Sequence, residues 1–389
     1  MVTMESADKA LKSFYLGAVT EALDQKVNPL LAQVKKTTAD VWGKDVRKLV
    51  RYGVNGGIGA GTETGNLPDA SGNQYVQFVS TLKNLYGVIE ISDKAMKASA
   101  NNEGAFVNLL NDEMQGLIRS SSFNFGRMLY GDGNGKIGDV IAVVDNSLEL
   151  ESVKAFSEGM IVDVYKSDGT LATGGKGKKV VSVDRTNWTV IFDGAAFVQE
   201  EFINGGSVYL QGSQGNEITG LAAIFESDSI YGVDKESHAW MKPYVETEVG
   251  DIDDNAIQKA IDTIEENSGS KINFIVCSAG VRRALVKYYK TNGIRLSDVE
   301  IEGGYKAITF NGIPVVVDRF CPDFTMYLLN TDDFCLHQLC DWQWLEGEDG
   351  KILKQIPGKP VYTATLVKYA ELMCSRPNGQ GMLTGIKEA

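Results

Sequence analysis

The sequence lacks any apolar run long enough to cross a membrane. A membrane-spanning helix needs about 18 consecutive apolar residues, and the longest runs here are far shorter. Charged residues also interrupt the first 25 positions, at Lys9, Lys12, Glu21 and Asp24. We therefore predict neither a membrane protein nor a secreted one.

Cysteine and histidine are scarce. An odd number of scattered cysteines is a poor disulfide framework, and it favours reduced thiols in a cytoplasm: Cys277, Cys321, Cys335, Cys340 and Cys374. Cys335, His337 and Cys340 could suggest a metal site. On a strand, however, the first two face one side and the third faces the other, so we predict structural roles.

Nucleotide, calcium and acyl-transfer motifs are missing. Residues 57–62 lack the third glycine of a dinucleotide-binding loop, and no serine or threonine follows Lys136 as a P-loop requires. Ile137 stands where a calcium loop needs glycine. Only His238 and His337 could serve as histidine bases, without a nucleophile motif. We predict no enzyme activity, catalytic residue, metal or cofactor.

The net charge of −13 argues against a protein whose surface binds nucleic acid tightly. Hydrophobic residues make up 43% of the chain and charged residues 23%, which is ordinary for a folded protein. With 389 residues the chain can form two to three domains.

A glycine-rich hairpin is the most distinctive stretch. Residues 46–52 and 75–82 are rich in β-branched and aromatic side chains and predict two strands. Between them, residues 53–72 contain seven glycines and only three large apolar side chains, at Val54, Ile58 and Leu67. Because this tip cannot form its own core, we predict an arm that lies on a neighbouring molecule; a loose surface hairpin is the alternative.

The rest of the chain alternates between helical and strand patterns. Residues 5–36 predict an amphipathic helix interrupted near Pro29, and residues 103–130 predict a long helix that ends at Gly131. Closely spaced strands and glycine turns over residues 139–215 predict a small β-barrel or sandwich. Further on we predict helices capped near residues 251–254 and by Ser278, a hairpin at Asn311-Gly312, and a long strand over residues 361–374.

This order of elements resembles the major capsid proteins of tailed bacteriophages, an α+β architecture called the Johnson fold. Residues 275–285, 310–316 and 369–377 are similar to the family's A-domain strand and helix, its recurrent hairpin and its final P-domain strand. The resemblance implies the following division: N-terminal arm 1–42, E-loop hairpin 43–92, spine helix of the P-domain 93–138, inserted β-rich domain 139–215, mainly A-domain 216–345, and returning P-domain strands 346–389.

The resemblance also implies a structural function. Copies of the chain would assemble into pentamers and hexamers that form an icosahedral head around double-stranded DNA, bound without sequence specificity. The implied location is the virion, after assembly in the bacterial cytoplasm. A separate scaffolding protein or none is implied, because no long charged helical region precedes the arm, and portal and decoration proteins are further implied partners.

Interface residues are the candidate site under this interpretation. In the hairpin we expect subunit contacts from Tyr52, Ile58, Leu67, Tyr75 and Phe78, and in the N-terminal arm from Leu11, Phe14 and Tyr15. No lysine lies between Tyr52 and Leu82, so we expect a shell without the lysine cross-links of some relatives. Two alternatives stay open: an encapsulin-like compartment that encloses a cargo enzyme, and a small-molecule enzyme. The inserted domain would either stabilise hexamers or bind a host glycan.

Overall fold

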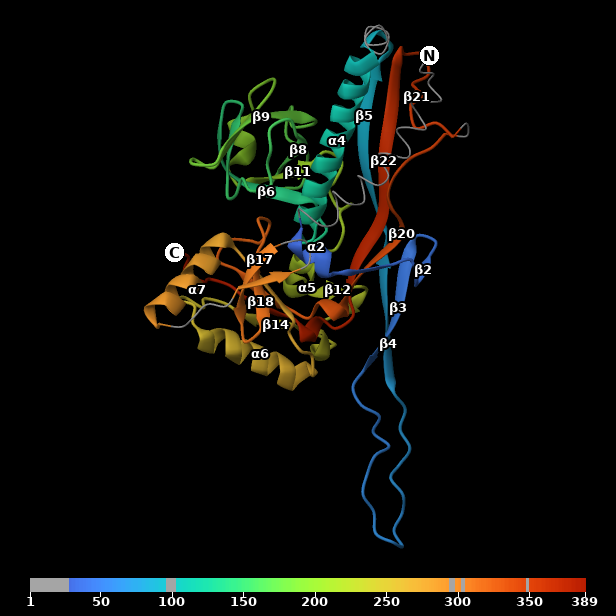
Figure 1. Cartoon of the computed structure of the whole chain (residues 1–389), viewed down its shortest axis with the longest axis vertical. Helices are drawn as coiled ribbons and strands as arrows, with labels where there is room; N and C mark the ends of the chain where they lie inside the picture. Colours follow the sequence, from blue (N-terminus) through green and yellow to red (C-terminus); the bar gives the residue numbers. More distant parts are fainter. Residues whose placement is uncertain (1–27, 96–102, 294–297, 302–304, 348–349) are drawn as a thin grey trace.

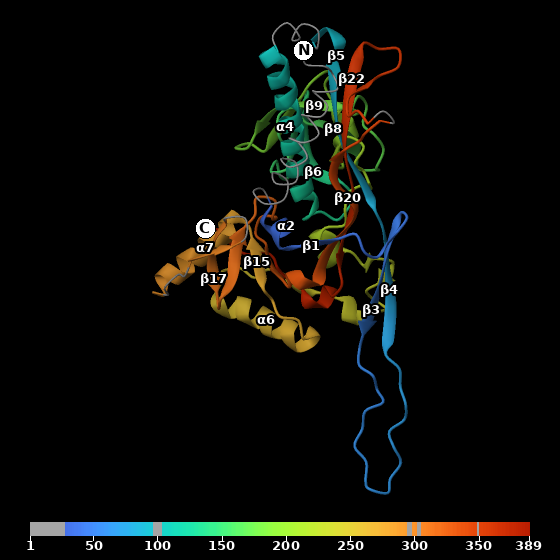
Figure 2. The same cartoon turned by 45° about the vertical axis from the view of Figure 1, so that its right-hand side comes forward.

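A computed structural model describes residues 28–95, 103–293, 298–301, 305–347 and 350–389. An elongated body carries three packed units, and a long hairpin projects from one end of it (Figures 1 and 2). The hairpin consists of β3 (Asp45–Tyr52) and β4 (Gln74–Thr81), with β2 (Val41–Trp42) beside β3. We call residues 45–81 the arm and residues 53–73 its tip.

The long helix α4 (Glu103–Met128) forms as predicted, ending two residues earlier than expected. Its side chains Met114, Ile118 and Phe125 are buried in the largest hydrophobic cluster of the molecule. Apolar residues at spacings of three and four place these side chains on one face of the helix. That face packs along β5 (Lys83–Ser92).

A five-stranded sheet lies beside α4. The predicted strand over residues 361–374 is β22 (Val361–Cys374), which pairs antiparallel with β5 over ten register pairs, from Val361–Ser92 to Ala370–Lys83. The other strands are β1 (Lys35–Thr37), β20 (Phe334–Trp344) and β21 (Lys354–Gln355), and β1 runs parallel to β20. The sheet therefore contains strands from near the start and from near the end of the described chain.

The β-rich stretch forms a closed barrel. Its strands follow the order β10, β7, β6, β11, β8, β9. Their bounds are β6 (Lys136–Val144), β7 (Ser147–Leu150), β8 (Ile161–Lys166), β9 (Lys178–Asp184), β10 (Thr189–Phe192) and β11 (Gly206–Leu210). Alternating residues fill its interior, among them Leu148, Val162, Val190 and Phe192. The barrel thus has its own core, and it begins three residues before the predicted segment.

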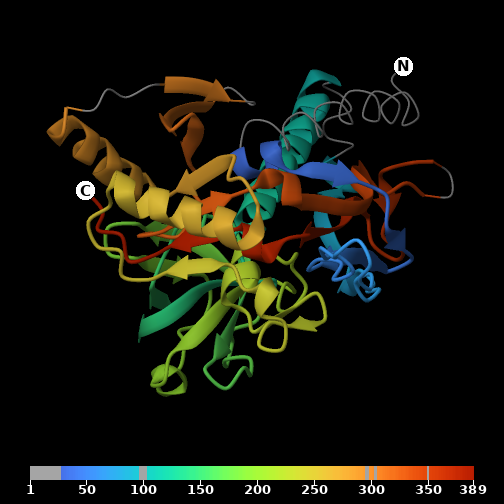
Figure 3. The same ribbon diagram turned by 90° about the horizontal axis from the view of Figure 1, so that it is seen from below.

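A second mixed unit contains a seven-stranded sheet in the order β14, β23, β19, β15, β18, β17, β16. The strands are β14 (Tyr244–Glu246), β15 (Phe274–Cys277), β16 (Asp298–Ile301), β17 (Tyr305–Phe310), β18 (Ile313–Val317), β19 (Met326–Leu329) and β23 (Gly381–Leu383). Helices α6 (Asp254–Ser268) and α7 (Ala279–Thr291) pack on it. In the view along the arm (Figure 3), the helices and the barrel occupy separate positions around the body. We call this the seven-stranded unit.

Local sequence signals account for the boundaries of this unit. The side chain of Asp253 accepts a hydrogen bond of 2.7 Å from the amide of Ala256 and begins α6, as Ser278 begins α7 through the amide of Val281. Asn311 and Gly312 both have positive φ, 48° and 85°, which a two-residue hairpin of this twist requires. These three predictions are confirmed. Short elements join the units: α5 (Leu221–Glu226), β12 (Ser229–Ile230) and β13 (Val233–Asp234).

The predicted helix over residues 5–36 is wrong at its described end. The described part of that stretch forms the short helix α2 (Pro29–Gln33) and then the strand β1. Pro29 begins α2 after Asn28, whose backbone is extended, because proline has no amide hydrogen and suits the first helical position. The following residues pair with β20, so tertiary hydrogen bonding decides their conformation.

A buried carboxyl group at the centre of the fold makes stability depend on pH. Glu371 of β22 is fully buried; its Oε1 accepts a 3.0 Å hydrogen bond from the amide of Thr219, and its Oε2 has no partner among the described residues. Burial raises the pKa of Glu371 to about 7, against the lowering effects of the Thr219 hydrogen bond and the charge of Lys83. The folded chain therefore binds this proton more tightly than the unfolded chain does.

We expect Glu371→Gln to become more stable relative to the natural chain as pH rises. Because the folded pKa lies above the unfolded one, the native contribution of Glu371 is present below the unfolded pKa and is lost as pH rises through about 7. The loss amounts to roughly 3 kcal/mol, and glutamine, which has no proton to release, avoids it. Urea unfolding of both chains at pH 5 and pH 8 measures the difference; a difference that is the same at both pH values would contradict this assignment.

Candidate assembly surface

The arm is fixed to the body at its base by stacked aromatic rings. Tyr52 lies parallel to Trp240 with ring centroids 4.8 Å apart, and Phe78 lies 6.4 Å from the same ring. The amide of Val79 donates a 3.0 Å hydrogen bond to the carbonyl of Tyr231, whose ring lies 5.5 Å from Phe78. Such aromatic pairs stabilise a fold by more than the burial of their apolar area alone would. The base therefore holds the direction of the arm.

The tip has no comparable support. The register between the two arm strands ends at the pair Tyr52–Gln74, and the tip beyond it forms no strand. Its apolar side chains Val54, Ile58 and Leu67 are 84%, 85% and 89% exposed. Local hydrogen bonds, such as that from the Gly65 amide to the Thr62 carbonyl, shape its turns without burying them. The tip thus presents apolar side chains to the solvent.

The five predicted interface residues of the arm differ in how exposed their side chains are. Ile58 and Leu67 lie on the exposed tip, and Tyr75 is 54% exposed on the stem. Tyr52 is partly covered by its stacking on Trp240. The prediction for Phe78 is wrong: this side chain is 0% exposed, because Trp240 and Tyr231 cover it, and no neighbour can bury it further. Leu11, Phe14 and Tyr15 lie outside the described residues.

A second exposed apolar surface lies on the five-stranded sheet. Leu85 and Ile89 of β5 are buried, whereas Tyr86 and Val88 between them are 59% and 55% exposed on the opposite face of the strand. Tyr86 meets Tyr369 of β22 edge to face at 6.3 Å. We call Tyr86, Val88 and Tyr369 the sheet strip. The predicted interface residues do not include it, although β5 is apolar on both faces, a pattern that indicates a strand covered on both sides.

His337, Cys335 and Cys340 lie on β20, buried or half-buried. His337 is buried, its Nδ1 lies 3.1 Å from the carbonyl oxygen of Ala39, and burial lowers its pKa. Cys335 and Cys340 are half-buried on the same strand. Within the part of the chain that the structure describes, no three His, Cys, Asp or Glu side chains are placed to hold a metal ion. Among the described helices, none is long and apolar enough to span a membrane.

Two cavities border α4. One of about 230 Å³ lies between α4, β5 and the segment that leaves the barrel, and includes Asn84, Leu117 and Trp342. The other, of about 440 Å³, lies between the barrel and the loop that follows β18. Three cations on its walls, Arg127, Lys136 and Lys154, form ion pairs with Glu217, Asp139 and Asp323, each at hydrogen-bonding distance. These cations are therefore matched by carboxylates.

Comparison with solved structures identifies the fold. The chain matches the capsid asymmetric unit of cyanophage A-1(L) with a TM-score of 0.55 at 10% identity, covering 94% of this chain and 92% of that chain. Weaker matches are the capsid of Myoviridae phage XM1 (TM-score 0.49, 11% identity, 93% and 92% covered) and the holo-SrpI encapsulin of Synechococcus elongatus (0.47, 10%, 93% and 89%). No family model and no curated protein matches the chain. The chain has the capsid fold of tailed bacteriophages, which confirms the predicted α+β fold class.

Proposed function

We propose that this chain, which has the tailed-phage capsid fold, is a major capsid protein, a structural subunit with no catalytic role. The observation that carries the proposal is the arm, whose base is fixed by aromatic stacking while its tip exposes Val54, Ile58 and Leu67. Contiguous exposed apolar surface marks interaction sites in soluble proteins. On this proposal a neighbouring subunit covers the apolar side chains of the tip and so orders it.

The shell would form from pentamers and hexamers around double-stranded DNA, within a phage head assembled in the host cytoplasm. On this proposal the arm corresponds to the E-loop within residues 43–92, α4 to the spine helix within 93–138, and the seven-stranded unit to most of 216–345. Residues 1–42 would form the N-terminal arm and residues 346–389 the returning P-domain strands. Scaffolding, portal and decoration proteins are the proposed partners.

The barrel, within residues 139–215, corresponds to an inserted domain on this proposal. It closes on its own core, so its outer wall is free to make contacts between subunits. Several large apolar side chains on that wall are exposed, among them Ile141, Val144 and Val181. Such side chains favour a role in stabilising hexamers over the binding of a host glycan.

Shortening the arm tests the proposal. Replacing residues 54–72 by Asn-Gly would close β3 and β4 with a tight turn and remove the exposed tip. We expect the variant to keep the melting temperature of the isolated natural subunit, because the tip adds no core, and to lose closed shells. Electron microscopy of both purified proteins measures assembly. Shells of normal yield from the shortened chain would overturn the role of the tip.

The contents of purified particles distinguish the alternatives. A capsid protein expressed during infection should enclose DNA, whereas an encapsulin-like subunit should enclose a protein cargo. A small-molecule enzyme should remain monomeric at all concentrations, with a ligand in one of its cavities. Nuclease-protected DNA in the particles supports the capsid proposal, and a protected protein cargo in DNA-free particles supports the compartment.

A further inference from the structure

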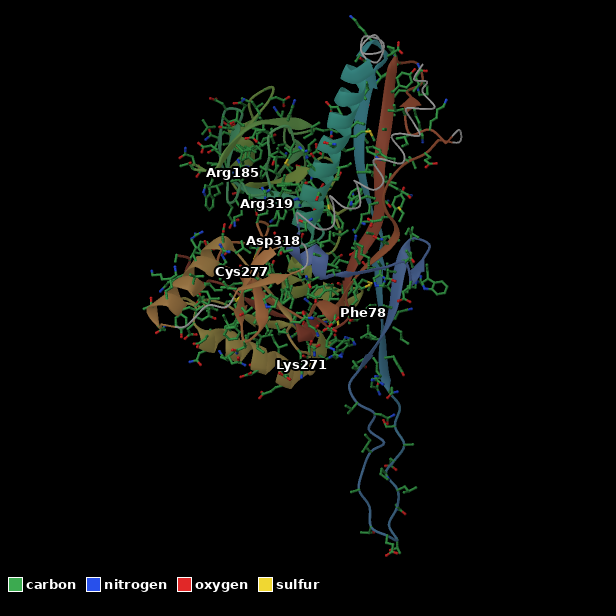
Figure 4. The ribbon with its side chains drawn as sticks, viewed as in Figure 1. Phe78, Arg185, Lys271, Cys277, Asp318 and Arg319 are labelled. Carbon is green, nitrogen blue, oxygen red and sulfur yellow. The ribbon has the colours of Figure 1, made fainter. Side chains whose placement is uncertain are left out.

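Two arginines from separate units approach each other between the barrel and the seven-stranded unit. Arg185 lies in the turn after β9 of the barrel, and Arg319 lies just after β18. Figure 4 shows them one above the other where the two units face each other. Burial, and then the positive charge of Arg185, lower the pKa of Arg319. Like charges held this close favour an anion between them.

Among the described residues neither arginine forms a salt bridge, although the charge of the neighbouring Asp318 partly offsets the burial that lowers the pKa of Arg319. Arg185 donates a 3.2 Å hydrogen bond from Nη2 to the carbonyl of Phe156. The guanidinium of Arg319 lies over the rings of Phe123 and Phe320, 4.7 Å and 5.2 Å from their centroids. Both side chains are exposed. This differs from the cations of the adjoining cavity, each of which has its own carboxylate.

The cavity of about 440 Å³ adjoins the two arginines. Phe320, beside Arg319, lines it, as does Trp188 from the turn that carries Arg185. At its edge Trp188 and Phe324 are 45% and 52% exposed, and both have positive φ, 53° and 59°. A left-handed conformation at a large residue is costly and clusters at functional positions. We call the cavity with Arg185 and Arg319 the arginine groove.

We propose that the arginine groove binds the arm tip of a second copy of this chain, with Leu67 in the cavity and the carboxylates of Glu63 and Asp69 at the arginines. The inference rests on the proposed shell function and names the contact that the tip makes. A carboxylate can accept two parallel hydrogen bonds from one planar guanidinium, and such bidentate pairs are stronger than hydrogen bonds between neutral groups. The apolar part of the cavity wall, which includes Ile137, Phe320 and Phe324, suits a branched aliphatic side chain.

The tip complements the groove in charge and in apolar content. Residues 53–73 contain two charged side chains, Glu63 and Asp69, and both are acidic and exposed. Leu67, two residues before Asp69, is the most exposed large apolar side chain of the tip, at 89%. The arm points away from the body, so its tip cannot reach the groove of its own molecule (Figures 1 and 2). The occupant must come from another copy.

A charge exchange tests the pairing directly. One variant carries Glu63→Arg and Asp69→Arg, a second carries Arg185→Glu and Arg319→Glu, and a third carries all four changes. We expect each double variant to lower the yield of shells by roughly tenfold or more, because like charges then face each other across the contact. The fourfold variant should restore most of that yield, since opposite charges face each other again.

The matched control exchanges charge outside the groove, at the exposed pair Lys387–Asp251, and should leave shell yield unchanged. Circular dichroism and the melting temperature of each isolated subunit show whether it folds. Unchanged yield from both double variants, or a fourfold variant no better than the doubles, would refute the contact. Normal shells that lose bound DNA in the Arg185→Glu, Arg319→Glu variant would assign the arginines to phosphate and overturn it too. Failure of the natural chain to form shells would instead refute the proposed function.

Discussion

Replacing Gly220 with alanine should leave almost no folded subunit. A Cβ at this position would overlap the carbonyl oxygen of Met128 and lie 2.6 Å from those of Leu129 and Gly131. All three are backbone atoms at the end of α4, and the amide of Leu221 donates a 2.8 Å hydrogen bond to the Leu129 carbonyl. The clash cannot be relieved by a side-chain rotation. We expect a loss above about 4 kcal/mol, which is rare for one methyl group.

The matched control is Gly116→Ala within α4, the helix whose end Gly220 contacts. A Cβ at Gly116 would meet nothing within 4 Å, so alanine should stabilise the helix by about 1 kcal/mol through its higher helical propensity. The soluble fraction on expression and the urea midpoint compare the two variants. A soluble Gly220→Ala subunit with a midpoint near that of the natural chain would show that the return from the barrel to α4 is less tightly packed than the structure has it.

Removing the carboxylate of Glu217 should destabilise the subunit by about 3–5 kcal/mol, since it leaves a buried arginine without its counter-ion. Arg127 near the end of α4 and Glu217 on the segment leaving the barrel form an ion pair with 9% and 3% of their side chains exposed. The bond to Glu217 comes from Nη2 of Arg127, and its Nε has no hydrogen-bond partner among the described atoms. The measurement is the urea unfolding free energy of Glu217→Ala at neutral pH.

Two further variants separate this mechanism from a loss of packing. Arg127→Met combined with Glu217→Leu should recover most of the stability, because apolar side chains of similar size replace both charges. Asp251→Ala should cost less than about 0.5 kcal/mol, as its pair with Lys387 is exposed. A double variant as unstable as Glu217→Ala would show that shape, and not the unpaired charge, causes the loss.

Local chemistry made much of the fold predictable. Ser278 can cap a helix with its own side chain, Asn311-Gly312 can adopt the turn alone, and the apolar content of β22 reflects a strand buried on both faces. The residues of β1 were less predictable. Their extended conformation comes from pairing with β20, some 300 positions away, and no short window of sequence contains that information.

The candidate surface was predictable only in part, because exposure depends on what covers each face. The tip was correctly expected to lack a core, since its glycines supply no side chains. Phe78 was misassigned because strand alternation does not say which face meets Trp240. The arginine groove could not be expected at all: its residues come from two units brought together by tertiary packing, and neither sequence neighbourhood is unusual.

The path of the chain through the arm has a mechanical consequence. Only Leu82 separates β4 from β5, so one nearly continuous length of backbone leads from the tip into the five-stranded sheet. The pairing of β5 with β22 runs along the same direction as the arm (Figure 1). Tension on the tip would load its ten register pairs in shear, all together, instead of opening them one after another. A subunit pulled by its neighbour would therefore resist through the whole β5–β22 ladder at once.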